Sequence, residues 1–149
     1  MAITRLDPHT ALLVIDLQQG IVAYPTAHPI KAVLAHAGEL AKMFRRHRLP
    51  VVLVNVDGGA PGRTEQPMRG GTRPADWTEL ASELNQQPDD ITLTKHTWGA
   101  FARTDLESRL KKLGVTQVVI AGIATSIGVE SSAGRLTSWA STLPSRSMR

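Results

Sequence analysis

Two ionisable side chains that can act as an acid–base pair each follow a predicted strand. Asp16 comes directly after the apolar residues 11–15, and Lys95 comes directly after residues 91–94. A lysine beside a carboxylate either holds it ionised or shares a proton with it, while a partly dry pocket can raise the carboxyl pKa enough for acid catalysis. A structural ion pair is the alternative explanation of the same two residues.

A third feature with chemical potential is the turn after the apolar residues 118–121. The run breaks at Gly122 into small and hydroxyl residues and resumes as a helical pattern after Gly128. In open α/β sheets ligands lie beyond the carboxyl ends of the strands, and a helix that begins there directs backbone N–H groups at negative charge. We therefore expect residues 125–128 to close one side of a site that contains Asp16 and Lys95.

A parallel sheet is the architecture that brings these three features together. The patterns predict strands at residues 11–15, 51–56, 91–94 and 118–121, an amphipathic helix over 32–48 and a short helix over 77–84. Capping-box spacing at 76–79 and 104–107 marks two helix starts, and the second helix should bury Leu106, Leu110 and Leu113 before stopping at Gly114. Alternating strands and helices predict a three-layer, Rossmann-like α/β fold in which helices flank a parallel sheet.

Composition narrows the classes of function. A chain of 149 residues predicts one domain, and the net charge of +4 is concentrated in a few arginines near the C-terminus, which argues against a nucleic-acid surface. The apolar runs are too short for a membrane span, so we expect a cytoplasmic protein. No cysteine is present, the histidines lack paired ligand spacing and no Gly-rich nucleotide loop follows a strand, so neither a metal nor a cofactor is expected.

Three stretches in this order resemble the isochorismatase-like hydrolases, a family that includes isochorismatases, nicotinamidases and cysteine amidases. Asp16 lies in LLVIDLQQG, Lys95 in ITLTKHTWGAF, and Gly128 in AGIATSIGVESSA. The resemblance implies Asp16 as the catalytic base of amidase members, Lys95 as its charged partner, and a nucleophilic cysteine where this chain has Gly128. Because glycine cannot attack a substrate, thiol-dependent amide hydrolysis is excluded. Isochorismatases of this family also lack that cysteine and use the aspartate to protonate a vinyl ether, which water then cleaves.

Several further residues are candidates for contact with a substrate. Trp98 and Phe101 either line an apolar pocket or pack in the core, and Gln18 and Thr125 either bind the substrate or satisfy neighbouring backbone. Asn55 or Asp57 can reach the site from the end of the second strand, and Ala124 belongs to the turn. The resemblance also implies a cis peptide bond that does not involve proline, within residues 123–125.

The leading function predicted from these features is a hydrolase that acts on a small, cyclic molecule without a thiol intermediate. The alternative is a catalytically silent domain of the same fold that serves as a small-molecule binding or subunit-interaction module. A small-molecule substrate is the expected partner in the first case, and we expect a homo-oligomer with neither nucleic acid nor membrane as a partner.

Residues 136–149 depart from both the helical pattern and the resemblance, which covers residues up to about 135. We therefore divide the chain into an isochorismatase-like domain, 1–135, and a basic tail, 136–149. With suitable codons the tail can be read in another frame as ADELGFNVTFAVDA, which would finish a helix and add an apolar strand. A frame change is thus our explanation of the tail. It predicts a C-terminally truncated fold with an uncovered sheet edge, prone to pairing, and a tail that is disordered or loosely docked.

Overall fold

The computed structural model describes residues 5–58, 72–124 and 128–140. Its sheet consists of four parallel strands in the order β3-β2-β1-β4. The strands are β1 (Thr10–Ile15), β2 (Val51–Val56), β3 (Ile91–Lys95) and β4 (Gln117–Gly122). The expected parallel α/β fold is confirmed, and Lys95 proves to be the last residue of its strand.

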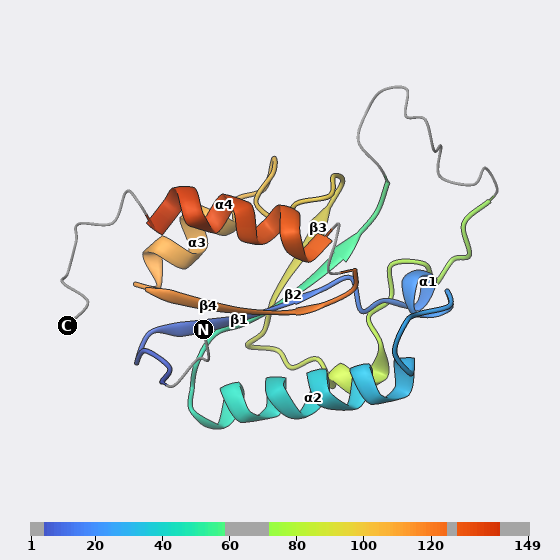
Figure 1. The fold of residues 1–149 in the computed structure, drawn as a ribbon, viewed down its shortest axis with the longest axis horizontal. Helices are drawn as coiled ribbons and strands as arrows, with labels where there is room; N and C mark the ends of the chain where they lie inside the picture. The colour runs from blue at the N-terminus through green and yellow to red at the C-terminus, as the bar shows by residue number, and fades with distance from the viewer. Residues whose placement is uncertain (1–4, 59–71, 125–127, 141–149) are drawn as a thin grey trace.

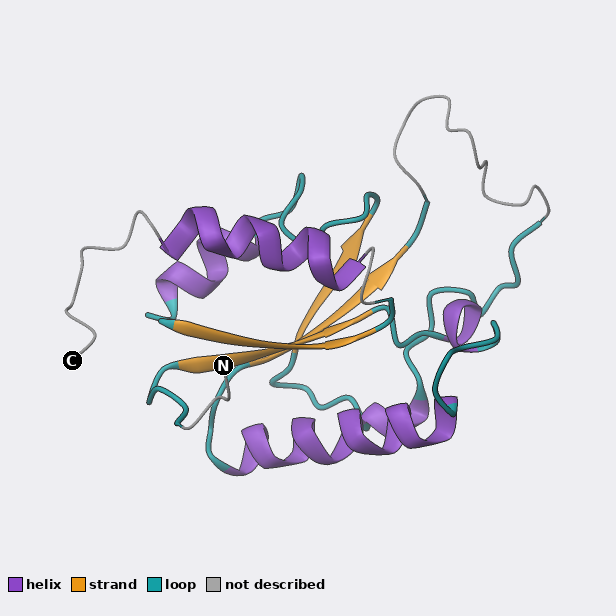
Figure 2. Cartoon of the chain, viewed as in Figure 1, coloured by secondary structure: helices purple, strands orange, loops and turns teal. Residues whose placement is uncertain are grey.

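Helices cover both faces of the sheet (Figure 1). The long helix α2 (Ile30–Arg46) lies on one face, while α3 (Leu106–Lys112) and α4 (Glu130–Ala140) lie on the other. The secondary-structure view shows the same three layers, with loops joining them at the ends of the strands (Figure 2). A helical turn, α1 (Gln19–Val22), follows β1.

The central strand β1 holds the layers together because both of its faces are buried. Leu13 and Ile15 pack with α3 residues on one face, and Leu12 and Val14 pack with α2 residues on the other. All six residues of β1 are buried, which is the pattern of a strand enclosed between helices. This burial explains the uninterrupted apolar run in the sequence.

The predicted helix over residues 77–84 is wrong. The structure has only a short 3-10 helix, η1 (Ser82–Leu84), at the end of this range. The backbone before it is bonded to the segment that follows β1: Ala81 donates to the Leu17 carbonyl at 2.9 Å, and the Glu79 carbonyl accepts from Gln19 at 2.8 Å. A helix would need this N–H and this carbonyl for its own hydrogen bonds. Tertiary pairing therefore overrides the local capping signal.

The predicted capping box at residues 104–107 is also wrong. Helix α3 begins at Leu106 with Asp105 as its N-cap, and no side chain bonds the free N–H groups there. The Thr104 hydroxyl instead donates to the Ala100 carbonyl at 2.6 Å. Leu106 is buried as expected, but Leu113 is 50% exposed because it lies beyond the end of the helix, next to the turn at Gly114.

The C-terminal helix extends further than the sequence pattern suggested. Helix α4 continues to Ala140, five residues into the range 136–149 that we expected to be irregular, and Leu136 packs against the core. The remaining tail, residues 141–149, lies outside the described part of the chain.

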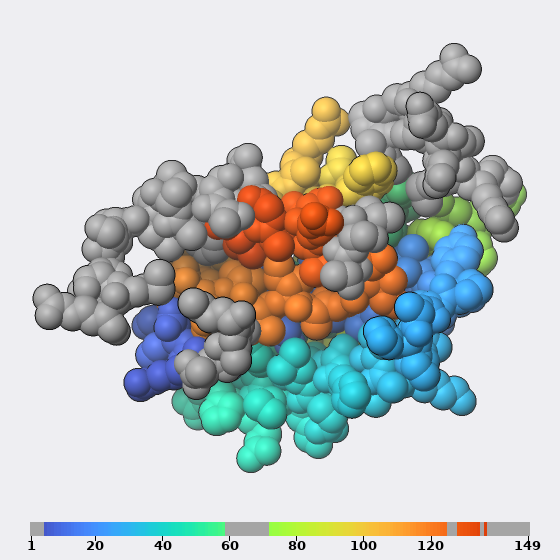
Figure 3. Space-filling view, viewed as in Figure 1, coloured from blue at the N-terminus to red at the C-terminus, as the bar shows by residue number. Residues whose placement is uncertain are grey.

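Within the described residues, β4 pairs with β1 and has no strand on its other side. Its residues are all partly exposed, in contrast to those of β1. In the space-filling view the orange band that includes β4 lies open at the surface between α4 and α2 (Figure 3). The described structure therefore agrees with the expected uncovered edge.

Two glycines within helices provide a matched test of how closely α2 packs against η1. A Cβ added at Gly38 in α2 would lie 2.4 Å from the Glu83 carbonyl oxygen, whereas one added at Gly134 in α4 meets no described atom within 4 Å outside the backbone of its own helix. We expect Gly38→Ala to lower the free energy of unfolding by about 1–3 kcal/mol because two backbones must separate. We expect Gly134→Ala to raise it by up to about 1 kcal/mol through helix propensity.

Urea denaturation of both variants against wild type measures the two changes. Equal shifts in the same direction would contradict the close approach of α2 to η1.

Candidate active site

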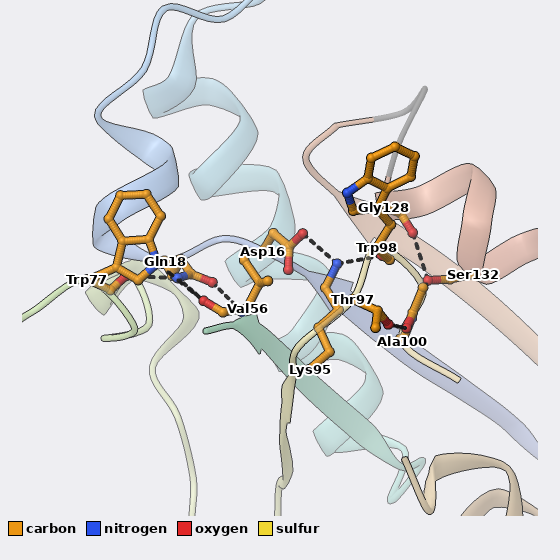
Figure 4. A network of polar contacts seen from close by, with 11 residues as sticks. Asp16, Gln18, Val56, Trp77, Lys95, Thr97, Trp98, Ala100, Gly128 and Ser132 are labelled. Carbon is orange, nitrogen blue, oxygen red and sulfur yellow. Dashed lines mark hydrogen bonds and ion pairs between the residues drawn. The ribbon is translucent and has the colours of Figure 1, made fainter. Parts of the chain in front are cut away.

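The carboxyl ends of β1 and β3 bring Asp16 and Lys95 into direct contact. Lys95 Nζ lies 2.8 Å from Asp16 Oδ2, and only 2% of the lysine side chain and 10% of the aspartate side chain are exposed. Lys95 Nζ also donates to the Trp98 carbonyl at 2.7 Å. Figure 4 shows these groups converging beyond the strand ends. The expected contact between Asp16 and Lys95 is therefore confirmed.

The backbone at Asp16 turns sharply out of β1. Asp16 has a φ of 57°, a left-handed conformation that costs a residue with a side chain about 1–3 kcal/mol and that commonly occurs at functional sites. Its N–H still donates to the Val54 carbonyl at 2.8 Å, so β2 anchors the turn. The turn places the carboxylate at the end of the sheet instead of on one of its faces.

Gly122, at the end of β4, permits the chain to pass close to this turn. It has a φ of +139°, and an added Cβ would lie 2.0 Å from the Ile15 carbonyl oxygen. The next residue, Ile123, donates its N–H to that same oxygen at 3.0 Å. Any side chain at Gly122 would therefore push the turn after β4 away from Ile15 and the adjoining Asp16.

The environment of Asp16 favours a proton on its carboxyl group. Burial raises the pKa of Asp16 above the ordinary value of 3.8, and the hydrogen bond and charge of Lys95 oppose that rise only in part. Oδ1 is buried and has no hydrogen-bond partner among the described residues. A buried carboxyl oxygen that lacks a hydrogen-bond partner is suited to exchange a proton with a bound molecule.

Gly128 lies against the same carboxylate from the start of the C-terminal helical segment. An added Cβ at Gly128 would lie 3.0 Å from Asp16 Oδ2 and 3.2 Å from Ile15 Cγ2. The position that the resemblance assigns to the nucleophile is thus adjacent to Asp16 in space. In this chain it carries no side chain that could react.

Gln18 and Asn55 make hydrogen bonds to the backbone. Gln18 is fully buried; its amide N–H groups donate to the carbonyls of Val56 and Trp77 at 2.9 and 2.8 Å, and its Oε1 accepts from the Val56 N–H at 2.6 Å. This geometry matches the alternative role, satisfaction of neighbouring backbone. Asn55 donates to the Thr78 carbonyl at 2.8 Å, while its buried Oδ1 lacks a partner among the described residues.

The two aromatic candidates differ in their surroundings. Trp98 is 61% exposed and follows Lys95 closely, whereas Phe101 is 7% exposed and packs in the core with Leu106 and Leu110. Trp98 is therefore accessible to a ligand, whereas Phe101 is part of the core. Asp57, the other candidate at the end of β2, pairs with Arg73 at 3.0 Å on the exposed side.

The turn after β4 is described in part. A cis peptide bond joins Ile123 to Ala124, inside the range where the resemblance implied one. The Ala124 carbonyl accepts from the Val129 N–H at 3.2 Å, which closes the turn. Thr125, a candidate for substrate contact, lies outside the described residues.

Sequence reasoning missed Ser132, a fully buried serine in α4. Its hydroxyl donates to the Gly128 carbonyl at 2.7 Å and accepts from the Ala100 N–H at 3.0 Å. The spacing of four residues from Gly128 was an available signal, because serine in a helix often bonds the carbonyl one turn earlier. The partner at Ala100 could not be found from the sequence.

Other classes of site receive no support from the part of the chain that is described. Residues 5–58, 72–124 and 128–140 contain no cluster of three or more His, Asp or Glu side chains arranged to hold a metal ion. Within the same ranges, every helix is too short or too polar to cross a membrane.

Burial and Lys95 have opposite effects on the pKa of Asp16, and removing the lysine charge tests this balance. Lys95→Met removes both influences that lower the pKa of Asp16, so we expect that pKa to rise further above 3.8. In this variant Asp16 of the unfolded chain loses its proton near pH 3.8, whereas Asp16 of the folded chain keeps its proton to a higher pH. Stability should therefore fall with rising pH until the folded-state pKa is passed.

Carbon-13 NMR titration of the Asp16 carboxyl group measures the shift. Lys111→Met is the control, because Lys111 makes an exposed pair with Glu107 in α3. A pKa of Asp16 that stays the same or falls in Lys95→Met would contradict the proposed balance.

Comparisons with known proteins agree with the fold. Residues 10–138 match the model of the isochorismatase domain. An uncharacterised isochorismatase family protein of Bacillus subtilis, YwoC, is 43% identical over 131 residues, which cover 83% of this chain and 68% of the relative. The ureidoacrylate amidohydrolase RutB of Pantoea ananatis is 30% identical over 160 residues, covering 87% of this chain and 64% of that enzyme.

A solved structure gives the same result. An isochorismatase family protein from Burkholderia thailandensis superposes with a TM-score of 0.84 at 39% identity, covering 92% of this chain and 76% of the other. The family match spans most of the chain and includes Asp16, Lys95 and Gly128. The chain therefore belongs to the isochorismatase family.

Proposed function

We propose that the protein is a hydrolase that cleaves a small, cyclic substrate by acid–base chemistry at Asp16 and Lys95, without a covalent thiol intermediate. The observation that carries this proposal is the buried Asp16 carboxyl group, which contacts Lys95 through Oδ2 and leaves Oδ1 without a partner among the described residues. A purely structural pair would be expected to satisfy both oxygens. The unpartnered oxygen supports a role in proton transfer.

The residue at position 128 supports one of the chemistries of the family over the other. The absence of a side chain at Gly128 removes the nucleophile, and an added Cβ there would lie only 3.0 Å from Asp16 Oδ2, in tight contact with the carboxylate. The chain contains no cysteine that could act in its place. Direct protonation of the substrate by Asp16 is therefore favoured over acyl transfer.

A vinyl ether is the substrate class that fits this chemistry. Protonated Asp16 donates its proton to the terminal carbon of the enol double bond, and the adjacent carbon becomes an oxocarbenium ion. Water adds to that carbon, the resulting hemiketal loses the alcohol, and a ketone remains, while the proton released by water returns to Asp16. Lys95 stabilises the transient Asp16 carboxylate, and burial favours the protonated form at the start.

The exposed face of Trp98 supports a cyclic substrate. Its backbone carbonyl is held by Lys95, while 61% of the residue remains accessible. A flat ring on the substrate can stack on such an indole with an energy of about 0.5–1.5 kcal/mol beyond the area buried. Trp98 and Asp16 then act on different parts of the same molecule.

The central test is a substrate screen with purified protein followed by Asp16→Asn. The panel should hold isochorismate and other enol ethers, and also amides such as ureidoacrylate and nicotinamide. We expect turnover of an enol ether, with kcat about 10²–10⁴-fold lower in Asp16→Asn, because the amide cannot donate the proton. Asp89→Asn, at an exposed position, is the matched control.

Amide hydrolysis by wild type, or full activity in Asp16→Asn, would refute this mechanism. Absence of turnover across the panel, together with binding of a panel member, would instead favour a silent binding domain of the same fold.

Trp98 provides a second test with a different expected result. We expect Trp98→Ala to raise KM several-fold with a smaller change in kcat, because the ring contributes binding but no proton. Leu113→Ala removes an exposed apolar side chain at the end of α3, on the amino-end side of β4, and should leave both constants unchanged. Steady-state kinetics on the substrate found in the screen measures both variants, and equal constants for Trp98→Ala and wild type would exclude Trp98 from substrate binding.

A further inference from the structure

A buried serine joins the two walls of the site across the carboxyl end of the sheet. One wall is the loop after β3, residues 96–100, whose Trp98 carbonyl accepts from Lys95. The other wall is the helical segment that begins at Gly128, whose backbone lies against Asp16. Ser132 bonds both walls, and Figure 4 shows its hydroxyl group between Ala100 and Gly128.

The direction of each hydrogen bond follows from the donors available. The Ala100 N–H can only donate, so the Ser132 oxygen accepts there at 3.0 Å. The single hydroxyl hydrogen is then directed to the Gly128 carbonyl at 2.7 Å. One hydroxyl group thus satisfies a buried donor and a carbonyl that belong to segments far apart in the sequence.

The surrounding packing shows that the two walls are closely fitted at this point. Ser132 is 0% exposed, and a Cβ added at Gly99 would lie 3.3 Å from the Ser131 carbonyl oxygen. The Ala100 carbonyl is held by the Thr104 hydroxyl at 2.6 Å, so the loop has a second anchor beyond the bridge. A serine that only capped its own helix would not require this contact with the loop after β3.

We propose that Ser132 is a positioning residue that fastens the β3 loop to the Gly128 segment and thereby keeps the Asp16–Lys95 pair enclosed and dry. The inference rests on the proposed function in one respect: it takes Asp16 to be the acid that protonates the substrate. Without the Ser132 hydroxyl group, the Ala100 N–H and the Gly128 carbonyl would need water molecules as hydrogen-bond partners. That water would enter next to Asp16. The consequence is measurable at Asp16 without any substrate.

Burial is the largest influence on the pKa of Asp16, and it raises that pKa. Water admitted beside the carboxylate weakens this influence, so opening the walls should lower the pKa toward 3.8. Among the described residues, Lys95 is the charged group in contact with Asp16, and its attraction acts in the same, lowering direction. Loss of the bridge therefore has the opposite sign to loss of Lys95.

The experiment is a carbon-13 NMR titration of the Asp16 carboxyl group in wild type, Ser132→Ala, Ser132→Cys and Ser131→Ala. We expect Ser132→Ala to lower the pKa of Asp16, and Ser132→Cys to lower it by less, since a thiol has nearly the size of the hydroxyl but bonds weakly. Ser131→Ala changes an exposed neighbour in the same helix and should leave the pKa unchanged. Should Ser132→Ala not fold, Ser132→Cys gives the same test with the packing preserved.

An unchanged or raised pKa of Asp16 in a folded Ser132→Ala or Ser132→Cys variant overturns the inference and leaves Ser132 with a purely structural role. A lowered pKa supports it. The readout is independent of turnover: a wild-type protein without activity would refute the proposed function, while the pKa change would still report on the bridge.

Discussion

The contact between Asp16 and Lys95 is the interaction around which the described structure is arranged. Two opposite charges with little exposure are costly to remove from water, and their attraction repays this cost only when both are well oriented. Here the lysine has two oxygen partners within 2.8 Å, while one aspartate oxygen is left without a partner among the described residues. The unpartnered oxygen therefore lowers the stability of the fold at the group that we propose transfers a proton to the substrate.

The backbone around the pair consists of segments that approach one another unusually closely. Asp16 turns out of β1 with a left-handed φ, Gly122 passes within reach of the Ile15 carbonyl, and Gly128 rests against the carboxylate. Such an arrangement requires a rigid base, which is supplied by the fully buried strand β1 and its parallel neighbours. Ser132 then connects the segments that the sheet itself does not join.

Membership of the isochorismatase family places this chain among proteins that share a fold but differ in their chemistry. The chain contains no cysteine, and Gly128 lies against the Asp16 carboxylate. A carboxyl group whose pKa burial raises can serve as an acid without a nucleophile. The chemistry we propose therefore follows from the residues at this site and not from the fold.

The amino-acid sequence by itself determined the order of the strands along the chain, their approximate limits and the position of Asp16 and Lys95 at strand ends. Continuous apolar runs and a clear helical period carry that information locally. Only the tertiary structure decided how residues 77–84 run, because their backbone bonds go to the segment after β1. It also showed that the Gln18 amide bonds backbone groups and that Ser132 reaches Ala100. Each of these outcomes depends on a hydrogen-bond partner distant in the chain, and no local pattern of residue types specifies such a partner.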